Sequence, residues 1–359
     1  MRFEVKVEEL AASCGLAARA VAGRVFRPAL GALHLLATPT GVVVTGTDGD
    51  LTISAEVAAQ VDKTGAIAVP ARRLVELLSR CGKGSLTVEG VDGEARLQWQ
   101  RTRGTMQGVA EFPEVQWPAT WTPVPGLREA ATWCVFAAAR GENDRPLLTG
   151  VNLSKEGALA SDAFQFAHYA QALDVDATVP AHALTVLGQV VSAGEVEVAM
   201  HPEGGQVCFR SGAVRVATRT LEGKYFDILG IVPRKWSTTV VVERAELLGA
   251  LGRVLTVSEA APTPVRCVIR EDGLTLVASS GGNTVEEDVA ATVTGDLLQP
   301  SLNGQQWMHA LRSFAGETLT ARLTGPESLV LWGEGDDKCF GQMPLQVPEV
   351  VNEVEAESA

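Results

Sequence analysis

The sequence repeats one helical pattern, and this repeat constrains the fold more than any other feature. The stretch AVPARRLVELLSRC occupies residues 68–81, and TVPAHALTVLGQVV follows 110 positions later at residues 178–191. Proline is typical of the start of a helix, because the N–H that it lacks would have no partner there. The apolar residues of the first stretch have the i, i+3, i+4, i+7 spacing of one helical stripe, at Leu74, Leu77, Leu78 and Cys81.

A third, weaker copy of the pattern is LNGQQWMHALRSF at residues 302–314. The positions equivalent to the stripe are Leu184, Leu187, Gly188 and Val191 in the second copy and Trp307, Ala310, Leu311 and Phe314 in the third. Each copy is followed by an alternating segment: GSLTVEG, GEVEVAM or ETLTARL. Alternation of apolar and polar residues indicates a strand with one buried face. A helix leading into a strand is therefore predicted three times.

Other phrases repeat in step with these helices. RPALGALHL at residues 27–35 matches RPLLTGVNL at residues 145–153. Three corresponding segments begin at Gly41, Gly157 and Gly273, and each unit also opens with a helix-like run. Every unit therefore spans about 115 residues and contains helix, strands, helix and strands. Alternating strands with Gly and Asp at their turns favour antiparallel sheets, so we predict an α+β fold.

Two segments rich in Pro and Trp mark the junctions between the units: QWPATWTPVPG at residues 116–126 and VPRKWS at residues 232–237. Such segments interrupt regular structure. We predict three tandem domains and an acidic tail without aromatic residues, which we expect to be disordered. Their bounds are 1–121, 122–235, 236–347 and, for the tail, 348–359.

The composition argues against several classes of protein. No apolar run approaches the roughly 18 residues of a membrane span, and the first residues lack the apolar block of a signal peptide. The six cysteines and five histidines are dispersed, without the spacing of a metal site or a disulfide framework. We therefore expect a cytoplasmic protein with free thiols, no metal and no other cofactor. The net charge of −13 argues against a conventional nucleic-acid binder.

Several phrases, in their order and spacing, match a known family. They are GTDGDL at 46–51, VPARRLVELLSR at 69–80, EFPEVQW at 111–117, RPLLTGV at 145–151, SDAFQF at 161–166, EGKYFDILGIVP at 222–233 and MPLQV at 343–347. With them the chain resembles the bacterial sliding clamp family, the beta subunit of DNA polymerase III, from residue 1 to about 347.

This resemblance implies three tandem DNA-clamp domains, with antiparallel sheets outside and helices lining a ring. Two protomers of the family join head to tail around duplex DNA. The ring is a processivity factor in DNA replication, not an enzyme, and it tethers the replicative polymerase, the clamp loader and repair proteins. A closed ring is held on DNA by topology, so an acidic chain needs only a locally basic lining.

Cationic residues in the predicted helices and beside them are the candidates for this lining. The DNA-facing set is Arg19, Arg24, Arg72, Arg73, Arg80, Lys83, Arg128, Arg140, Arg253 and Arg312. Arg73 and Arg80, seven positions apart, lie within about 20° of each other on a helix, and Arg24 matches a DNA-facing position of the family. The second copy of the helix has only His182 in place of arginines. The alternative is that these residues are solvated faces of amphipathic helices.

The resemblance also implies a cleft for partner peptides between the second and third domains, which takes short motifs of the Q-x-x-L-x-F kind. Its residues would be Arg145, Leu148, Ser161, Ala163, Phe164, Phe166, Phe226, Gly230, Ile231, Met343, Pro344, Leu345 and Val347. Phe164 and Phe166 share one face if this segment is extended, although such a pair is also typical of a strand core. Met and Leu near residue 345 suit an adaptable groove.

The cleft departs from the family pattern. The phrase T-D-G-[HY]-R-L, which is usual in the family, is replaced by SDAFQF at residues 161–166. Phe226 stands where the family commonly has proline, and Gly230 stands where it commonly has arginine. We therefore expect a bulkier, more aromatic and less cationic pocket. This leaves open an alternative function: a divergent clamp paralogue that acts as a specialised or resistance-type protein-binding scaffold with an altered partner motif.

For the dimer interface the resemblance points to Leu78 and Met106 on one side and to Leu255 and Val257 on the other. All four are equally compatible with a position in the protein core.

Catalytic motifs are absent from the sequence. Ser161, Asp162 and His168 are close together without a G-x-S-x-G elbow, and no phosphate-binding loop of the G-x-x-x-x-G-K-[ST] kind is present. The Asp48-Gly49-Asp50 segment lacks the other oxygen ligands of a calcium loop. Asp48 and Asp162 are better explained as turn residues whose side chains bond nearby backbone N–H groups. We predict no enzymatic activity.

Overall fold

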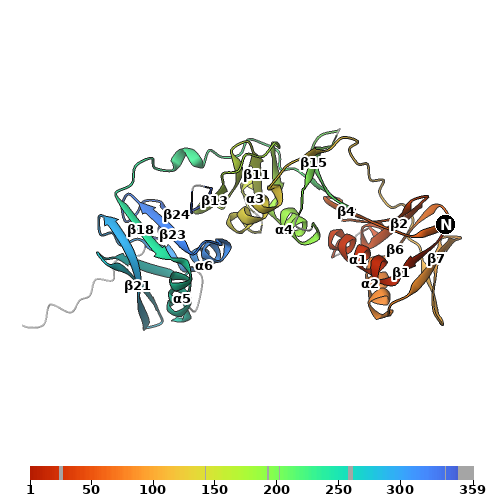
Figure 1. Cartoon of the computed structure of the whole chain (residues 1–359), viewed down its shortest axis with the longest axis horizontal. Coiled ribbons are helices and arrows are strands. Elements are labelled where there is room, and N and C mark those ends of the chain that lie inside the picture. The colour runs from red at the N-terminus through yellow and green to blue at the C-terminus, as the bar shows by residue number, and fades with distance from the viewer. Residues whose placement is uncertain are drawn as a thin grey trace, which may run out of the picture. The chain divides into compact units, whose positions relative to one another are not determined.

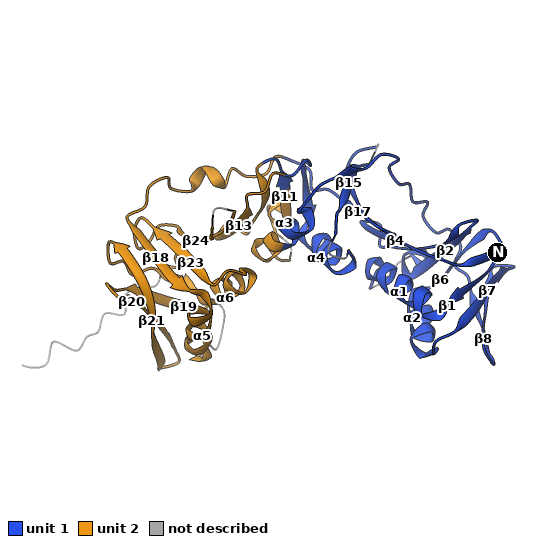
Figure 2. Cartoon of the chain, in the orientation of Figure 1, with its two compact units in different colours: residues 1–132, 153–155, 173–223 blue, residues 133–152, 156–172, 224–359 orange. Residues whose placement is uncertain are grey.

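The structure is a computed structural model that describes residues 1–23, 27–141, 143–191, 194–201, 203–257, 262–335 and 337–346. Arg24, Val347 and the acidic tail 348–359 lie outside the described residues. The chain forms two compact units, shown in Figure 2. Unit 1 holds residues 1–132, 153–155 and 173–223, and unit 2 holds residues 133–152, 156–172 and 224–359. The three domains with bounds at 121 and 235 stay a prediction.

Unit 1 contains two antiparallel sheets, and Figure 1 labels several of their strands. The first has the order β5 (Gln60–Lys63), β1 (Arg2–Lys6), β7 (Ser85–Val91), β8 (Glu94–Trp99) and β9 (Thr102–Gln107). The second has the order β10 (Thr122–Pro123), β15 (Glu197–Met200), β16 (Gln206–Ser211), β17 (Val214–Arg219), β4 (Leu51–Val57), β3 (Gly41–Thr47), β2 (Ala32–Thr38) and β6 (Gly65–Pro70). The remaining elements of unit 1 are β14 (Ala177–Pro180), α1 (Val7–Ala17), η1 (Ala18–Ala20), η2 (Pro28–Gly31), α2 (Ala71–Arg80) and α4 (Ala181–Val190).

Helix α2 is the helix predicted from the first repeated stretch, and it begins directly after Pro70. Leu74 and Leu78 are buried in the core of unit 1, and Leu77 and Cys81 pack against that core while partly exposed. The same core includes Phe3 and Val5, whose side chains alternate with exposed neighbours along β1. The apolar stripe therefore does what its spacing predicts: it joins the helix to the sheet.

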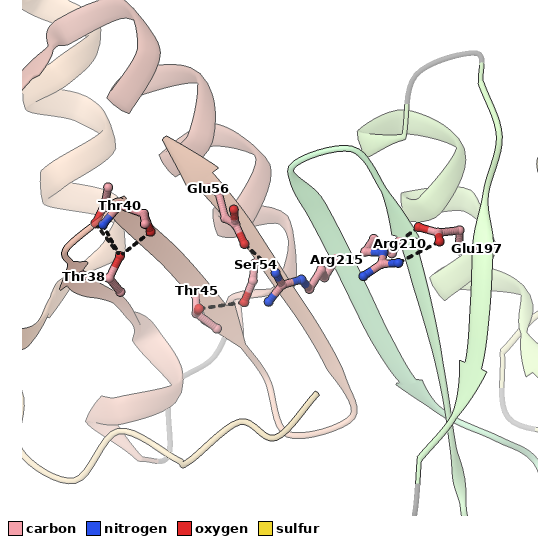
Figure 3. A network of polar contacts seen from close by, with 9 residues as sticks. Thr38, Thr40, Thr45, Ser54, Glu56, Glu197, Arg210 and Arg215 are labelled. Carbon is pink, nitrogen blue, oxygen red and sulfur yellow. Dashed lines mark hydrogen bonds and ion pairs between the residues drawn. The ribbon is translucent and has the colours of Figure 1, made fainter. Parts of the chain in front are cut away.

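Strand β17 joins β4 across the predicted boundary at residue 121. The pairing runs from Val214 opposite Ala55 to Thr218 opposite Leu51. Ion pairs accompany these strands on the face drawn in Figure 3, where Arg215 contacts Glu56 at 2.5 Å. Residues of the first and second predicted domains thus share one continuous sheet inside unit 1.

A second ion pair in Figure 3 links β15 to β16. The Arg210 guanidinium donates two hydrogen bonds to Glu197, at 2.5 and 2.7 Å, and lies 4.7 Å from the ring centroid of Trp121. The hydrogen bond from Arg210 holds the pKa of the Glu197 carboxyl below its ordinary value. Because Trp121 belongs to the predicted junction segment, this contact fixes that segment against the sheet.

Unit 2 contains one long antiparallel arrangement. Its order is β12 (Gly157–Ser161), β13 (Gln165–Tyr169), β25 (Lys338–Gln342), β24 (Val330–Glu334), β23 (Thr318–Leu323), β18 (Thr238–Glu243), β21 (Asn283–Gly295), β20 (Gly273–Ser280), β19 (Pro264–Ile269) and β22 (Ser301–Asn303). Its helical elements are η3 (Val135–Ala137), η4 (Pro146–Thr149), η5 (Leu229–Ile231), α5 (Arg244–Val254), η6 (Leu255–Val257) and α6 (Gly304–Ser313). The chain crosses between the units within α3 (Leu127–Cys134) and β11 (Gly150–Ser154).

The second and third copies of the helix form α4 and α6, as predicted. In α6, Trp307, Ala310, Leu311 and the following Phe314 are all buried. In α4 the gap in the stripe has a physical reason: a Cβ at Gly188 would lie 2.8 Å from the Thr132 methyl group. A small residue is therefore needed where the other copies have leucine.

The repeat extends to equivalent glycines in three hairpins. Gly41, Gly157 and Gly273 open β3, β12 and β20. A Cβ at Gly41 would lie 2.7 Å from the carbonyl oxygen of Val57, and one at Gly273 would lie 2.5 Å from that of Val289. At Gly157 it would overlap the carbonyl oxygen of Tyr169. The same close approach of backbones thus recurs in all three repeated segments.

No helix in the described part of the chain is long and apolar enough to cross a membrane.

Candidate functional site

An apolar cavity of about 230 Å³ lies within unit 2. Its lining residues are Arg145, Leu148, Ser161, Ala163, Phe164, Gln165, Phe166, Phe226, Asp227, Ile228, Ile231, Leu329 and Met343. Most of the predicted cleft residues are therefore brought together here. Gly230, Pro344 and Leu345 are described but do not line the cavity. Gln165, Asp227, Ile228 and Leu329 line it without having been predicted.

A tight turn presents Phe164 at the cavity. Asp162 Oδ1 accepts hydrogen bonds from the backbone N–H groups of Phe164 and Gln165, both at 2.9 Å, and Ala163 has a left-handed φ of 80°. Asp48 makes the same turn, accepting from Asp50 at 2.9 Å and from the following residue at 2.8 Å. The prediction that both aspartates are turn residues is confirmed.

This turn changes the interpretation of the two phenylalanines. Strand β13 begins at Gln165, so Phe164 precedes the strand and its side chain is 68% exposed. Phe166 lies within the strand and is 3% exposed. The expectation that both lie on one face of an extended segment is wrong, because the Asp162 turn bends the chain before β13. Both rings nevertheless line the same cavity.

The Phe166 ring occupies space that a glycine leaves empty. Phe166 is paired with Gly341 across β13 and β25, and a Cβ at Gly341 would overlap this ring, lying 2.6 Å from its Cζ. The pairing continues beyond β25, where the Met343 N–H donates to the carbonyl oxygen of Phe164 at 2.8 Å. This hydrogen bond places the partly exposed Met343 in the cavity wall.

The segment around η5 forms another part of the wall. The Ser161 N–H donates to the hydroxyl oxygen of Tyr225 at 3.1 Å, and burial raises the pKa of that hydroxyl. The neighbouring Phe226 is exposed, and the Arg145 guanidinium lies 6.0 Å from its ring centroid. No carboxylate of the described residues forms an ion pair with Arg145. The wall is therefore aromatic with one cation at its edge.

Amide side chains connect the turn to α6 and β25. Asp162 Oδ2 accepts from Gln165 Nε2 at 2.9 Å and from Gln306 Nε2 at 3.0 Å. Gln342 Nε2 donates to Gln306 Oε1 at 3.2 Å and to the Asn303 carbonyl oxygen at 3.0 Å. The network holds the turn that carries Phe164. Its members are far apart in sequence, so no local pattern could have identified it.

The predicted DNA-facing residues fall into two groups. Five are exposed and form no ion pair with any described residue: Arg72, Arg73, Lys83, Arg140 and Arg312. The others that the structure describes have partners within the chain. Arg19 bonds Gln189, Arg80 pairs with Glu76 at 2.8 Å, and Arg253 pairs with Glu287.

Arg128 is the most constrained of the predicted cations. Its Nε donates to the carbonyl oxygen of Val191 at 2.9 Å, and its terminal nitrogen donates to that of Gly188 at 2.7 Å. Carbonyl groups at the end of a helix lack intrahelical partners, and a cation satisfies them well. Arg128 therefore stabilises the end of α4, in addition to any contact with a ligand.

The predicted interface residues differ in exposure. Leu78 is 2% exposed and belongs to the core of unit 1. For Leu78 the core alternative is the correct one, because a side chain this buried has no surface to offer a second protomer. Met106, on the edge strand β9, is half-buried against the same core. Leu255 and Val257, in η6, are also partly exposed.

The sequence matches two models of one known protein family. A family model described as "DNA polymerase III beta subunit, N-terminal domain" matches residues 1–110, and one described as "DNA polymerase III beta subunit, C-terminal domain" matches residues 230–346. Together these two parts of one subunit cover more than half of the chain. The chain belongs to the DNA polymerase III beta subunit family.

Relatives of known name agree with this family over nearly the whole chain. The beta sliding clamp of Synechococcus elongatus is 27% identical, with 92% of this chain and 95% of the relative covered. That of Bacillus subtilis is 24% identical, with coverage of 97% and 99%.

Solved structures show the fold. The crystal structure of the sliding clamp from Bacillus subtilis has a TM-score of 0.90 at 22% identity and covers 97% of this chain and 99% of its own. A clamp from Pseudomonas aeruginosa bound to griselimycin has a TM-score of 0.89 at 21% identity, with coverage of 97% and 100%. The predicted fold class, an α+β arrangement of tandem DNA-clamp domains, is confirmed.

Among the described residues, no group of three or more His, Cys, Asp or Glu side chains could hold a metal ion. The six cysteines are free thiols, and burial raises the pKa of Cys14 to about 12, so that this thiol stays uncharged.

Proposed function

We propose that this chain is a sliding clamp, a processivity factor without catalytic activity in DNA replication. In this proposal two protomers encircle duplex DNA head to tail and tether the replicative polymerase, the clamp loader and repair proteins. The observation that carries it is the cavity of unit 2, whose walls include most of the positions that the family uses for partner peptides. The near-complete coverage of the named relatives supports a whole clamp rather than a single module.

DNA contact would rest on a few cations in an otherwise acidic chain. Arg72 and Arg73 of α2 are exposed and free of ion pairs with the described residues, as is Lys83 shortly after this helix. Such side chains contact phosphates without reading sequence, and the contact weakens as salt rises. A ring held by topology needs no tighter grip, so a net charge of −13 is compatible with this role.

Charge on two strands supports the head-to-tail order. Edge strand β9 carries exposed Arg103, and the exposed Arg101 directly precedes it. Strand β21 carries exposed Glu286 and Asp288, and its Glu287 pairs with Arg253. Unlike charges steer association, whereas like charges in contact oppose it. A β9-to-β21 contact between two copies is therefore favoured over β9 against β9.

Reversing a charge on β9 tests this contact. We expect Arg103→Glu to raise the dimer dissociation constant about tenfold, because it places like charges at the interface. Analytical ultracentrifugation over a concentration series measures the effect. Lys63→Glu is the matched control, since exposed Lys63 lies on β5 at the opposite edge of the same sheet. A purely monomeric wild-type chain at micromolar concentration would contradict the ring itself.

Retention on DNA tests the whole proposal. The chain is loaded by its clamp loader onto nicked circular DNA, free protein is removed, and the DNA is then cut once. We expect the protein to stay on the circle and to leave after linearisation, because only topology holds it. Retention on the linear product, or loss from the intact circle, would argue against an encircling clamp.

A specialised scaffold is the second candidate. Phe226 and Gly230 replace a proline and an arginine that are common in the family, and Phe226 is exposed in the cavity wall. These two residues alter the surface that a partner peptide would meet. A panel of Q-x-x-L-x-F variants separates the candidates: an ordinary clamp binds the family motif best, whereas a scaffold binds a different sequence better and fails the retention assay.

A further inference from the structure

We propose that the acidic C-terminal segment of this chain, residues 348–359, occupies the unit 2 cavity in cis and competes there with partner peptides. The inference rests on the proposed function of that cavity. Its occupant is a stretch of the same chain, PEVVNEVEAESA, rather than a second protein.

The first argument is reach. Met343 lines the cavity, and two residues later the Leu345 N–H donates to the Ser301 carbonyl oxygen at 2.7 Å, which fixes the backbone. The Cα atoms of Met343 and Leu345 are at most about 7.6 Å apart, because consecutive Cα atoms are about 3.8 Å apart. Val350 is five residues beyond Leu345 and can extend about 16 Å from it. A single reversal of the chain therefore brings this segment back to the cavity.

The second argument is the match of apolar groups. The cavity walls present the exposed side chains of Phe164, Phe226 and Ile231, and exposed apolar groups are stabilised by being covered. Within the acidic segment the largest apolar side chains are those of Val350, Val351 and Val354. Valine is compact enough for a cavity of about 230 Å³, so the Val350–Val351 pair is the part that we place inside.

The third argument is charge. The Arg145 guanidinium in the cavity lining has no carboxylate partner among the described residues. The segment that contributes lining residues 226–231 also carries the exposed Lys224, Arg234 and Lys235 outside the lining, together with the exposed Glu222. Asp227 is the one carboxylate in the lining, and its Oδ1 already accepts from the Gly230 N–H at 2.9 Å. Glutamates flank the valines on both sides, at Glu349, Glu353, Glu355 and Glu357. The lining thus offers one cation without an ion-pair partner, and the residues that flank it in the chain add three cations against Glu222, which favours an acidic occupant.

Removing the segment tests the competition. We expect a chain that ends at Val347 to bind a fluorescent Q-x-x-L-x-F peptide about fivefold more tightly than the full chain, because a tethered competitor has a high effective concentration. The double substitution Val350→Ser with Val351→Ser should reproduce the gain while leaving every charge in place. Ser358→Ala, in the same segment, is the matched control and should leave the affinity unchanged. Equal affinities of full and truncated chains would overturn the inference.

A second measurement does not depend on the partner peptide. A photo-crosslinking benzoylphenylalanine replaces Asn352 in the full chain, so that the Val350–Val351 pair is kept, and mass spectrometry locates the adducts. We expect them at Phe164, Phe226 or Met343 of the same chain. Adducts elsewhere, or adducts on a second copy in an isotope-mixed sample, would refute a cis contact. Cavity adducts in a chain that binds no partner peptide would support the inference while contradicting the peptide-binding part of the proposed function.

Discussion

Gly46→Ala is expected to destabilise unit 1 by about 3 kcal/mol, at the upper end of the cost of overpacking a core. Gly46 lies in β3, where the end of α1 crosses the sheet. A Cβ at this position would overlap the carbonyl oxygen of Ala17 and lie 2.9 Å from its carbonyl carbon. Because the obstacle is backbone at the end of a buried helix, it cannot move aside as a side chain would. Urea denaturation measures the loss, and hydrogen exchange should locate it in α1 and β3.

The matched control is Gly15→Ala, in α1 itself. A Cβ there would meet nothing within 4 Å, and alanine favours a helix over glycine by about 0.5–1 kcal/mol. The two substitutions add the same methyl group and should change the free energy of unfolding in opposite directions. Equal effects would show that α1 does not approach β3 as closely as described.

Gly341→Ala is expected to weaken partner-peptide binding by about fivefold or more. The new Cβ would overlap the Phe166 ring, which lines the cavity, so the ring must move. An overpacking cost of about 1–3 kcal/mol corresponds to roughly 5-fold to 150-fold in affinity if the bound state bears it. Fluorescence anisotropy with a Q-x-x-L-x-F peptide measures the change.

Gly333→Ala is the control for this prediction. Gly333 lies on the neighbouring strand β24, and the nearest atoms to its Cβ would be carbonyl oxygens at 3.6 and 3.7 Å, an ordinary contact distance. Its peptide affinity should stay close to that of the unmodified chain. If both variants lose affinity equally, the effect comes from the sheet in general and not from Phe166.

The helices were predictable because their pattern is local. The spacing of Leu74 and Leu78 identifies a buried stripe, and the same spacing in α6 identifies Trp307 and Leu311. The sharing of one sheet by β4 and β17 was not predictable, since their residues are about 160 positions apart. Sequence periodicity shows which face of a strand is buried but does not show its neighbour.

The cavity was partly predictable, through the family resemblance rather than through periodicity. The spacing of Phe164 and Phe166 predicts a shared face only if the segment is extended, and the Asp162 turn places Phe164 before the strand. A turn at Asp162 and an extended segment through Phe164 exclude each other. The hydrogen bonds that Asp162 accepts from the backbone show that the turn is present. The contacts of Gln306 and Gln342 depend on tertiary packing alone.

The roles of individual cations were the least predictable. Arg128 and Arg253 are arginines in helices, like Arg73, yet their contacts differ. Arg128 donates hydrogen bonds to carbonyl groups at the end of α4, whereas Arg253 pairs with Glu287. A long flexible side chain takes whichever partner the fold brings near it. Among the described residues, a cation such as Arg73, which is exposed and forms no ion pair, keeps its charge available to a ligand.

The β17–β4 pairing determines whether the segment around Trp121 would carry the load between the two repeats. The strands before and after that segment are held together by five paired positions and by two ion pairs, Arg215–Glu56 and Arg219–Asp50. Load applied along the chain would therefore pass through the sheet and not through the linker. The Pro- and Trp-rich stretch marks where the polypeptide crosses from one repeat to the next, but the paired strands β4 and β17, and not this stretch alone, connect the two repeats within unit 1.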